Sequence, residues 1–178
     1  MSESLENFTN IVKEDIKEAK TLFFSEAFKE EYLKDRREEK ELYHQLLLGR
    51  NRNQILEEFL LSSGQKKPVL LSAAKTIYQA TIMNLDEPLE IKVKREGWGY
   101  LVGRIKSDGT FLSLHKNTFQ AEDFEDGTLT IYADMKTIPK DGDIDHLIIQ
   151  TVYQTLQIEV VYKAVSYTHL RAHETSAH

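Results

Sequence analysis

The stretch GQKKP, residues 64–68, is the point at which the hydrophobic pattern of the chain changes its period. Before it, apolar residues recur three and four positions apart, which places them on one face of an α-helix. After it, apolar and polar residues alternate, as they do in a strand with one face on a core and the other in solvent. We therefore expect a helical domain over residues 1–64 and a β-domain over residues 68–163.

The helical half predicts a small bundle. Its segments carry apolar stripes with helical spacing, and their aromatic members are expected to form the core: Phe8, Phe23, Phe24, Phe28, Tyr32, Tyr43 and Phe59. Asn10 and Asn53 stand before apolar runs and are predicted to cap helices. Gly64 is predicted to end the last helix, because glycine is common just past a helix C-terminus.

Short runs rich in Ile, Val, Leu, Tyr and Thr follow the boundary, and turn-forming residues separate them. The runs are KTIYQATI (75–82), LEIKVKRE (89–96), GYLVGRIKSD (99–108), FLSLHKNTF (111–119), TLTIYADM (128–135), DHLIIQTVY (145–153) and QTLQIEVVYK (154–163). About seven strands in about 100 residues is what an immunoglobulin-like sandwich requires. The predicted fold is therefore α+β, with a small helical bundle followed by a seven-stranded Ig-like β-sandwich.

Several stretches resemble a bacterial family catalogued as domain of unknown function 5717. The stretches are FTNIVKEDIKEAKTLFFSEAFKEEYL (8–33), NRNQILEEFLLSSGQKKPV (51–69), IKVKREGWGYLVGRIKSDGTFLSL (91–114) and IEVVYK (158–163). The resemblance implies a large multidomain protein in which Ig-like sandwiches alternate with helical repeats, and of which this chain is a truncated fragment. It transfers no catalytic residue to this sequence.

Composition excludes some classes of partner. The chain has 23 Lys and Arg against 29 Asp and Glu, a net charge of −6, and no concentrated basic patch that would neutralise phosphates. No apolar run approaches the roughly 20 residues of a membrane span, and the first residues do not resemble a signal peptide. We therefore expect no nucleic acid and no membrane as partner, and cytoplasmic localisation only as a default.

The stretch EGWGY, residues 96–100, has the strongest binding potential in the sequence. Glycines bracket Trp98, the only tryptophan, and Tyr100 follows. One interpretation is an exposed aromatic platform for a sugar or peptide ligand. The favoured interpretation is an interdomain contact, because a chain of two parts needs a seam and aromatic residues fill such seams well.

The sequence does not predict catalysis, a metal site or a cofactor. Ser107 beside Asp108 is typical of a turn between strands, and no nucleophile elbow occurs. The acidic stretches 122–127 and 141–145 lack the twelve-residue register of a calcium loop. We expect a non-catalytic structural or protein-interaction module whose partners are other domains of the same chain or other proteins. The alternative is a carbohydrate-binding β-sandwich module that binds polysaccharide.

The last fifteen residues, 164–178, are expected to be a non-native, disordered tail. Within them VSYTHLRAHET (165–175) resembles the translation of a sequencing adapter, and the run shows neither helical nor strand periodicity. On this interpretation the native polypeptide ends near Lys163.

Overall fold

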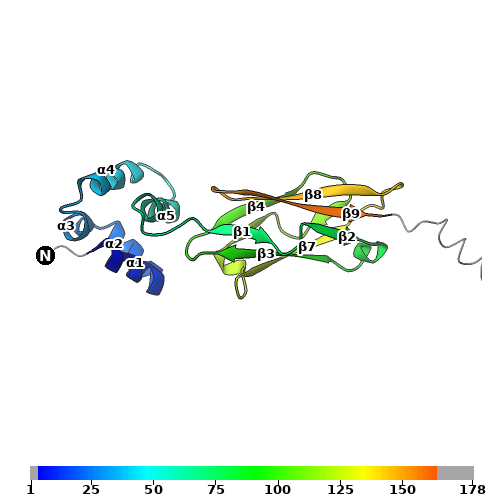
Figure 1. Cartoon of the computed structure of the whole chain (residues 1–178), viewed down its shortest axis with the longest axis horizontal. Coiled ribbons are helices and arrows are strands. Elements are labelled where there is room, and N and C mark those ends of the chain that lie inside the picture. The colour runs from blue at the N-terminus through cyan, green and yellow to red at the C-terminus, as the bar shows by residue number, and fades with distance from the viewer. Residues whose placement is uncertain (1–3, 164–178) are drawn as a thin grey trace, which may run out of the picture. The chain divides into compact units, whose positions relative to one another are not determined.

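The computed structural model describes residues 4–163, so the predicted tail lies outside the described residues. The chain forms two compact units. The helical unit contains residues 4–69 together with the segment Gly97–Tyr100, and the sandwich unit contains Leu70–Glu96 and residues 101–163 (Figure 1). A short stretch of the second half of the sequence therefore belongs to the helical unit.

Five helices form the helical unit: α1 (Leu5–Glu14), α2 (Ile16–Phe23), α3 (Ala27–Tyr32), α4 (Arg37–Leu46) and α5 (Arg52–Ser62). Their starts differ from the prediction. The side chain of Ser4 caps α1 and that of Asn51 caps α5, so the predictions for Asn10 and Asn53 were wrong. Ser4 accepts a hydrogen bond from a first-turn amide, which lets α1 begin earlier than the apolar stripe suggested.

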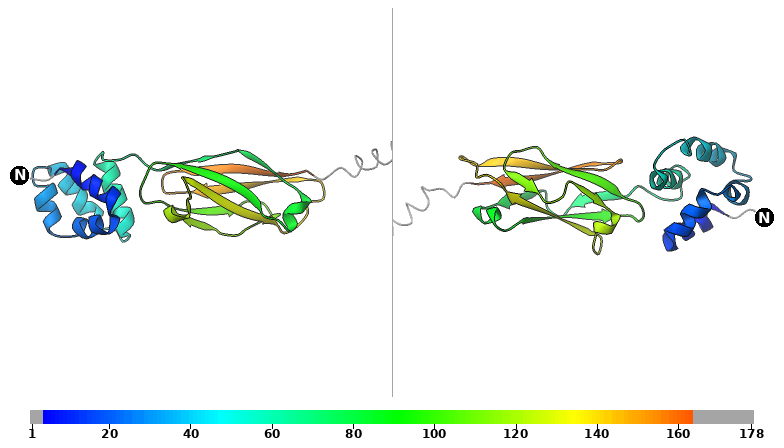
Figure 2. Two further views of the ribbon diagram at one scale, coloured as in Figure 1. Left: turned by 90° about the horizontal axis from the view of Figure 1, so that it is seen from below. Right: turned by 180° about the vertical axis from the view of Figure 1, so that it is seen from behind.

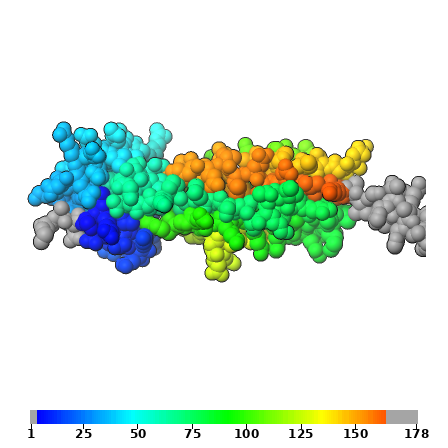
Figure 3. All heavy atoms as spheres, viewed as in Figure 1, coloured from blue at the N-terminus to red at the C-terminus, as the bar shows by residue number. Residues whose placement is uncertain are grey.

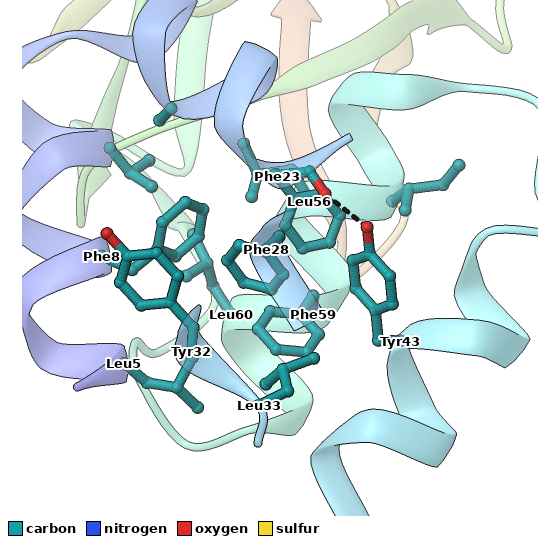
Figure 4. Close-up of a cluster of buried hydrophobic side chains, with 13 residues drawn as sticks. Leu5, Phe8, Phe23, Phe28, Tyr32, Leu33, Tyr43, Leu56, Phe59 and Leu60 are labelled. Carbon is teal, nitrogen blue, oxygen red and sulfur yellow. Dashed lines mark hydrogen bonds between the residues drawn. The ribbon is translucent and has the colours of Figure 1, made fainter. Parts of the chain in front are cut away.

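The core of the helical unit is a cluster of aromatic rings (Figure 4). Phe28 lies 4.8 Å from Phe8 and 4.9 Å from Phe23 between ring centroids. The Tyr43 hydroxyl donates to the carbonyl oxygen of Phe23 at 2.5 Å, and burial raises the pKa of this hydroxyl. All the predicted core aromatics are buried except Phe24, which is half-buried.

The sandwich unit contains two sheets (Figure 2). Its strands are β1 (Leu70–Ala73), β2 (Ile77–Ala80), β3 (Leu89–Glu96), β4 (Val102–Ser107), β5 (Leu112–Leu114), β6 (Thr118–Gln120), β7 (Thr128–Met135), β8 (Asp143–Gln150) and β9 (Thr155–Tyr162). The strand orders are β1-β3-β7-β5 and β2-β9-β8-β4-β6, and β2 runs parallel to β9. β2 and β9 lie side by side as green and orange surface in the space-filling view (Figure 3). Apart from the added edge strands β2 and β6, this is the strand order of an immunoglobulin sandwich, so the predicted fold class is confirmed.

The predicted number of strands was wrong, because the sandwich unit has nine rather than seven. β1 was missed, since it has only four residues beside the polar linker. The run 111–119 was predicted as one strand and forms two, β5 and β6, which lie in different sheets. His115 donates its amide to Tyr132 in one sheet, and Asn117 accepts from Ile105 in the other, so the chain crosses between the sheets within three residues.

None of the helices described over residues 4–163 has both the length and the apolar character that a membrane span requires.

Candidate functional site

A buried ion pair lies at the end of α5. The Lys66 ammonium is 2.5 Å from a carboxylate oxygen of Glu57, and the two side chains are 1% and 3% exposed. The local fold brings them together. Gly64 has φ +77°, and the amides of Gln65 and Lys66 both bond back to the carbonyl oxygen of Leu60, which turns the chain against the helix it has just left.

The same ammonium binds Trp98. Lys66 Nζ donates to the carbonyl oxygen of Trp98 at 2.5 Å and lies 4.3 Å from the centroid of its ring. Lys13 Nζ, from α1, lies 5.0 Å from that centroid, and the half-buried ring packs against the helical core. We call Glu57, Lys66 and Trp98 the Lys66 cluster. It joins two stretches that are 32 residues apart in sequence.

The glycines around Trp98 are required by the backbone. Gly97 and Gly99 have φ +104° and +99°, a region that residues with side chains rarely adopt. A Cβ at Gly99 would lie 2.7 Å from Lys66 Nζ and 3.5 Å from a carboxylate oxygen of Glu57. The Lys66 cluster therefore accepts only a glycine after the tryptophan.

Tyr100 completes the segment. Its hydroxyl oxygen is 3.5 Å from the side-chain amide nitrogen of Asn51, the residue that caps α5. Trp98 and Tyr100 are both half-buried. Their predicted role, as a ligand site or as an interdomain contact, stays a prediction.

Sequence reasoning singled out Trp98 and Tyr100 but missed Glu57 and Lys66. Glu57 precedes Glu58, and Lys66 precedes Lys67, so nothing in a single sequence distinguishes the buried member of each pair. The two residues are distinguished by tertiary structure, because in the folded chain the segment 97–100 packs beside α5 and helps to bury these two charges.

A second polar cluster lies in the sandwich unit, around the turn between β4 and β5. The buried carboxylate of Asp145 accepts hydrogen bonds from the Ser107 hydroxyl at 2.6 Å and from the Gly109 amide at 2.8 Å. Asp108 accepts from the backbone amide of His146 at 2.7 Å and contacts its ring at 3.0 Å. The Ser107 hydroxyl therefore donates to a carboxylate rather than to an imidazole, and the cluster joins the turn to β8 without forming a nucleophilic triad.

Asp108 predicts a pH dependence. The hydrogen bond from the His146 amide, together with the charge of the His146 ring, lowers the pKa of the Asp108 carboxyl. A lowered folded-state pKa gives stability that is present above the unfolded pKa and is lost as the pH falls through the folded value. We expect Asp108→Asn to lower the melting temperature at pH 7, and we expect the difference from wild type to shrink as the pH falls from about 5 to about 2.

Melting curves over this pH range measure that difference. Asp141→Asn, at an exposed aspartate before β8, is the control and should give a difference that does not change with pH. If the difference in melting temperature between Asp108→Asn and wild type stayed constant with pH, it would contradict the lowered pKa of the Asp108 carboxyl.

The acidic stretches do not come together as a metal site. Asp123 accepts the Gln120 amide at 2.8 Å and lies 3.7 Å from Lys116. Over residues 4–163, no group of three or more His, Asp or Glu side chains is placed to hold a metal ion. Two hollows of about 790 and 950 Å³ flank residues 115–119 of the sandwich unit. Both belong to the other unit and share no residue with the Lys66 cluster.

The fold and the Lys66 cluster define an Ig-like sandwich protein with a helical unit that binds an aromatic segment. The family model described as "Family of unknown function (DUF5717) N-terminal" matches residues 2–177, and the chain belongs to this family. No curated protein matches the chain significantly.

Three of the solved structures that match this chain show a distant likeness to it. The E. coli chaperone DraB is 8% identical with a TM-score of 0.44, and the match covers 55% of this chain and 56% of that one. The YadV chaperone is 12% identical with a TM-score of 0.40, and the match covers 56% and 53%. The Calx CBD1 domain is 11% identical with a TM-score of 0.37, and the match covers 55% and 100%. The matches therefore span about half the length of the two chaperones, and at these values they identify no function.

Proposed function

We propose that the chain is a non-catalytic structural module of a larger protein, in which the helical unit holds the segment Gly97–Tyr100 in place. The observation that carries this proposal is the engagement of Trp98 within the molecule. Its carbonyl oxygen binds Lys66, and its ring packs on the helical core. These two contacts, one to its backbone and one to its ring, favour a structural role for Trp98 over a role as an open ligand platform.

The same contacts argue against a carbohydrate platform. A sugar stacks on an open aromatic face, whereas the Trp98 ring already has two ammonium groups within 4.3 and 5.0 Å of its centroid. A sugar would have to displace Lys13, and Lys66 is held by Glu57. Polysaccharide binding is therefore the weaker of the two candidate functions.

The sandwich unit offers a surface for the partners of such a module. Ile77 and Ile144 are 57% and 48% exposed, although each belongs to a strand of the five-stranded sheet. They alternate with the buried Tyr78 and Asp145, so both lie on the outer face of this sheet. In this proposal, the contacts with other domains or proteins lie on this outer face.

Trp98→Ala tests the proposal. We expect the free energy of unfolding to fall by about 2 kcal/mol, because the substitution removes a half-buried ring that packs on the core and leaves a void beside a buried charge. Urea denaturation followed by far-ultraviolet circular dichroism measures this loss. Tyr132→Ala, which removes an exposed aromatic ring of β7, is the control and should change stability by roughly 0.5 kcal/mol or less.

Binding to sugars is tested on the wild-type chain, in which Trp98 is the only tryptophan. Titration with soluble polysaccharides should leave its fluorescence unchanged. A saturable change, together with a Trp98→Ala variant as stable as wild type, would overturn the structural role and favour carbohydrate binding.

A further inference from the structure

We infer that the Lys66 cluster makes the two units unfold together, in one transition, although each has its own core. This inference rests on the proposed structural role of Trp98 and adds a consequence for the whole chain. The coupling acts through the segment Gly97–Tyr100, which belongs to the helical unit but is continuous at both ends with strands of the sandwich unit.

The strands on either side of the segment are central to the sandwich. β3, which ends at Glu96, pairs with both β1 and β7. β4, which begins at Val102, pairs with both β6 and β8. If these strands unfold, the segment between them loses the two anchors that hold its ends. Trp98 would then leave the helical unit, because an unanchored segment regains its conformational entropy.

Loss of Trp98 would affect the helical unit at its buried charge. The Lys66 ammonium forms an ion pair with the carboxylate of Glu57 and donates a hydrogen bond to the carbonyl oxygen of Trp98, each at 2.5 Å. Without Trp98, a side chain that is 1% exposed would lose one acceptor and the ring beside it. A buried charge that loses a hydrogen bond is destabilised even when its ion pair remains, so the helical unit is expected to unfold with the sandwich.

The converse also follows. If the helical unit unfolds, the Trp98 carbonyl oxygen loses Lys66 as its hydrogen-bond donor, and the Trp98 ring loses the apolar surface on which it packs. Gly97 and Gly99 are then free to leave the positive φ that the folded segment requires. Each unit thus carries a stabilising contribution that exists only while the other is folded, which is the condition for one cooperative transition.

Lys66→Met on the whole chain tests the coupling. Methionine keeps an unbranched apolar stem but removes the donor that binds Trp98 and Glu57. Differential scanning calorimetry should give one transition for wild type and two for Lys66→Met, with the earlier one lower than wild type by roughly 10 °C or more. Lys67→Met, at the exposed neighbouring lysine, is the matched control and should keep the single transition within about 2 °C of wild type.

Trp98 fluorescence shows which unit unfolds in each transition. In wild type its emission should change together with the circular dichroism signals of helix and sheet. In Lys66→Met its emission should change with the earlier transition, before the sheet signal is lost. If Lys66→Met fails to fold, Glu57→Gln replaces it, because the amide keeps an acceptor for Lys66 and removes only the compensating charge.

Two separate transitions in wild type would overturn the inference, and so would a single transition in whichever of Lys66→Met and Glu57→Gln folds. The proposed function has a different point of failure. If wild type shows two transitions while Trp98→Ala still loses stability, Trp98 is structural and the units are uncoupled. If Trp98→Ala is as stable as wild type, the proposed function fails with the inference.

Discussion

Replacement of Phe23 with alanine is expected to lower the free energy of unfolding by about 4 kcal/mol, because it removes a fully buried ring from the centre of the helical core. Its ring centroid lies 4.9 Å from that of Tyr43 and 5.2 Å from that of Phe59. Rings from α1, α3, α4 and α5 all pack on it, so no single helix can move to fill the void. Urea denaturation followed by circular dichroism measures the loss.

Phe24→Ala is the matched control for this experiment. The two phenylalanines are adjacent, but Phe24 is half-buried and its ring faces the guanidinium of Arg52 at 4.6 Å. We expect the Phe24→Ala control to lower the free energy of unfolding by about 1 kcal/mol, since the core does not enclose much of this ring. Equal losses for the two variants would contradict the position that the structure assigns to Phe23.

Gly103→Val in β4 is expected to lower the free energy of unfolding by about 3 kcal/mol, because there is no space for a side chain at this position. A Cβ at Gly103 would lie 2.2 Å from Phe119 Cζ and 2.7 Å from the carbonyl oxygen of Gln150. The Phe119 ring could rotate, but the carbonyl belongs to the neighbouring strand β8. The sheet must therefore distort to accept valine.

Arg104→Ala is the control for the glycine substitution. Arg104 is the next residue of β4 and is exposed to solvent, so its removal should change stability by roughly 0.5 kcal/mol or less. Thermal and chemical denaturation of the two variants give the comparison. A Gly103→Val variant as stable as the control would contradict the close approach of the Gln150 carbonyl oxygen to Gly103.

The buried charges of the two units serve different contacts. In the helical unit, Lys66 connects α5 with a segment far along the chain. In the sandwich unit, Asp145 connects β8 with the turn after β4. Each charge binds backbone groups of a loop, and such hydrogen bonds define where a loop lies more sharply than apolar contacts do. These loops are expected to be the rigid ones in this molecule.

The local hydrophobic pattern of the sequence was sufficient to predict the fold class. The helical period before residue 64 and the alternation after residue 68 reflect burial of one face of each element, a property that each segment carries in its own residues. The core aromatics were found in the same way. Trp98 was also recognisable, because glycines on both sides of a lone tryptophan indicate an unusual backbone.

The remaining features depend on contacts between distant segments. β5 and β6 form one alternating run in the sequence, and pairing with β7 and β4 assigns them to different sheets. In the sequence, Glu57 and Lys66 look like ordinary surface charges. In the folded chain Lys66 contacts Trp98, which lies 32 residues further along. Periodicity records which side of an element is buried, but it carries no information about the partner that buries it. A charge inside a protein is stable only when that partner supplies hydrogen bonds, so the candidate site became visible only in the folded chain.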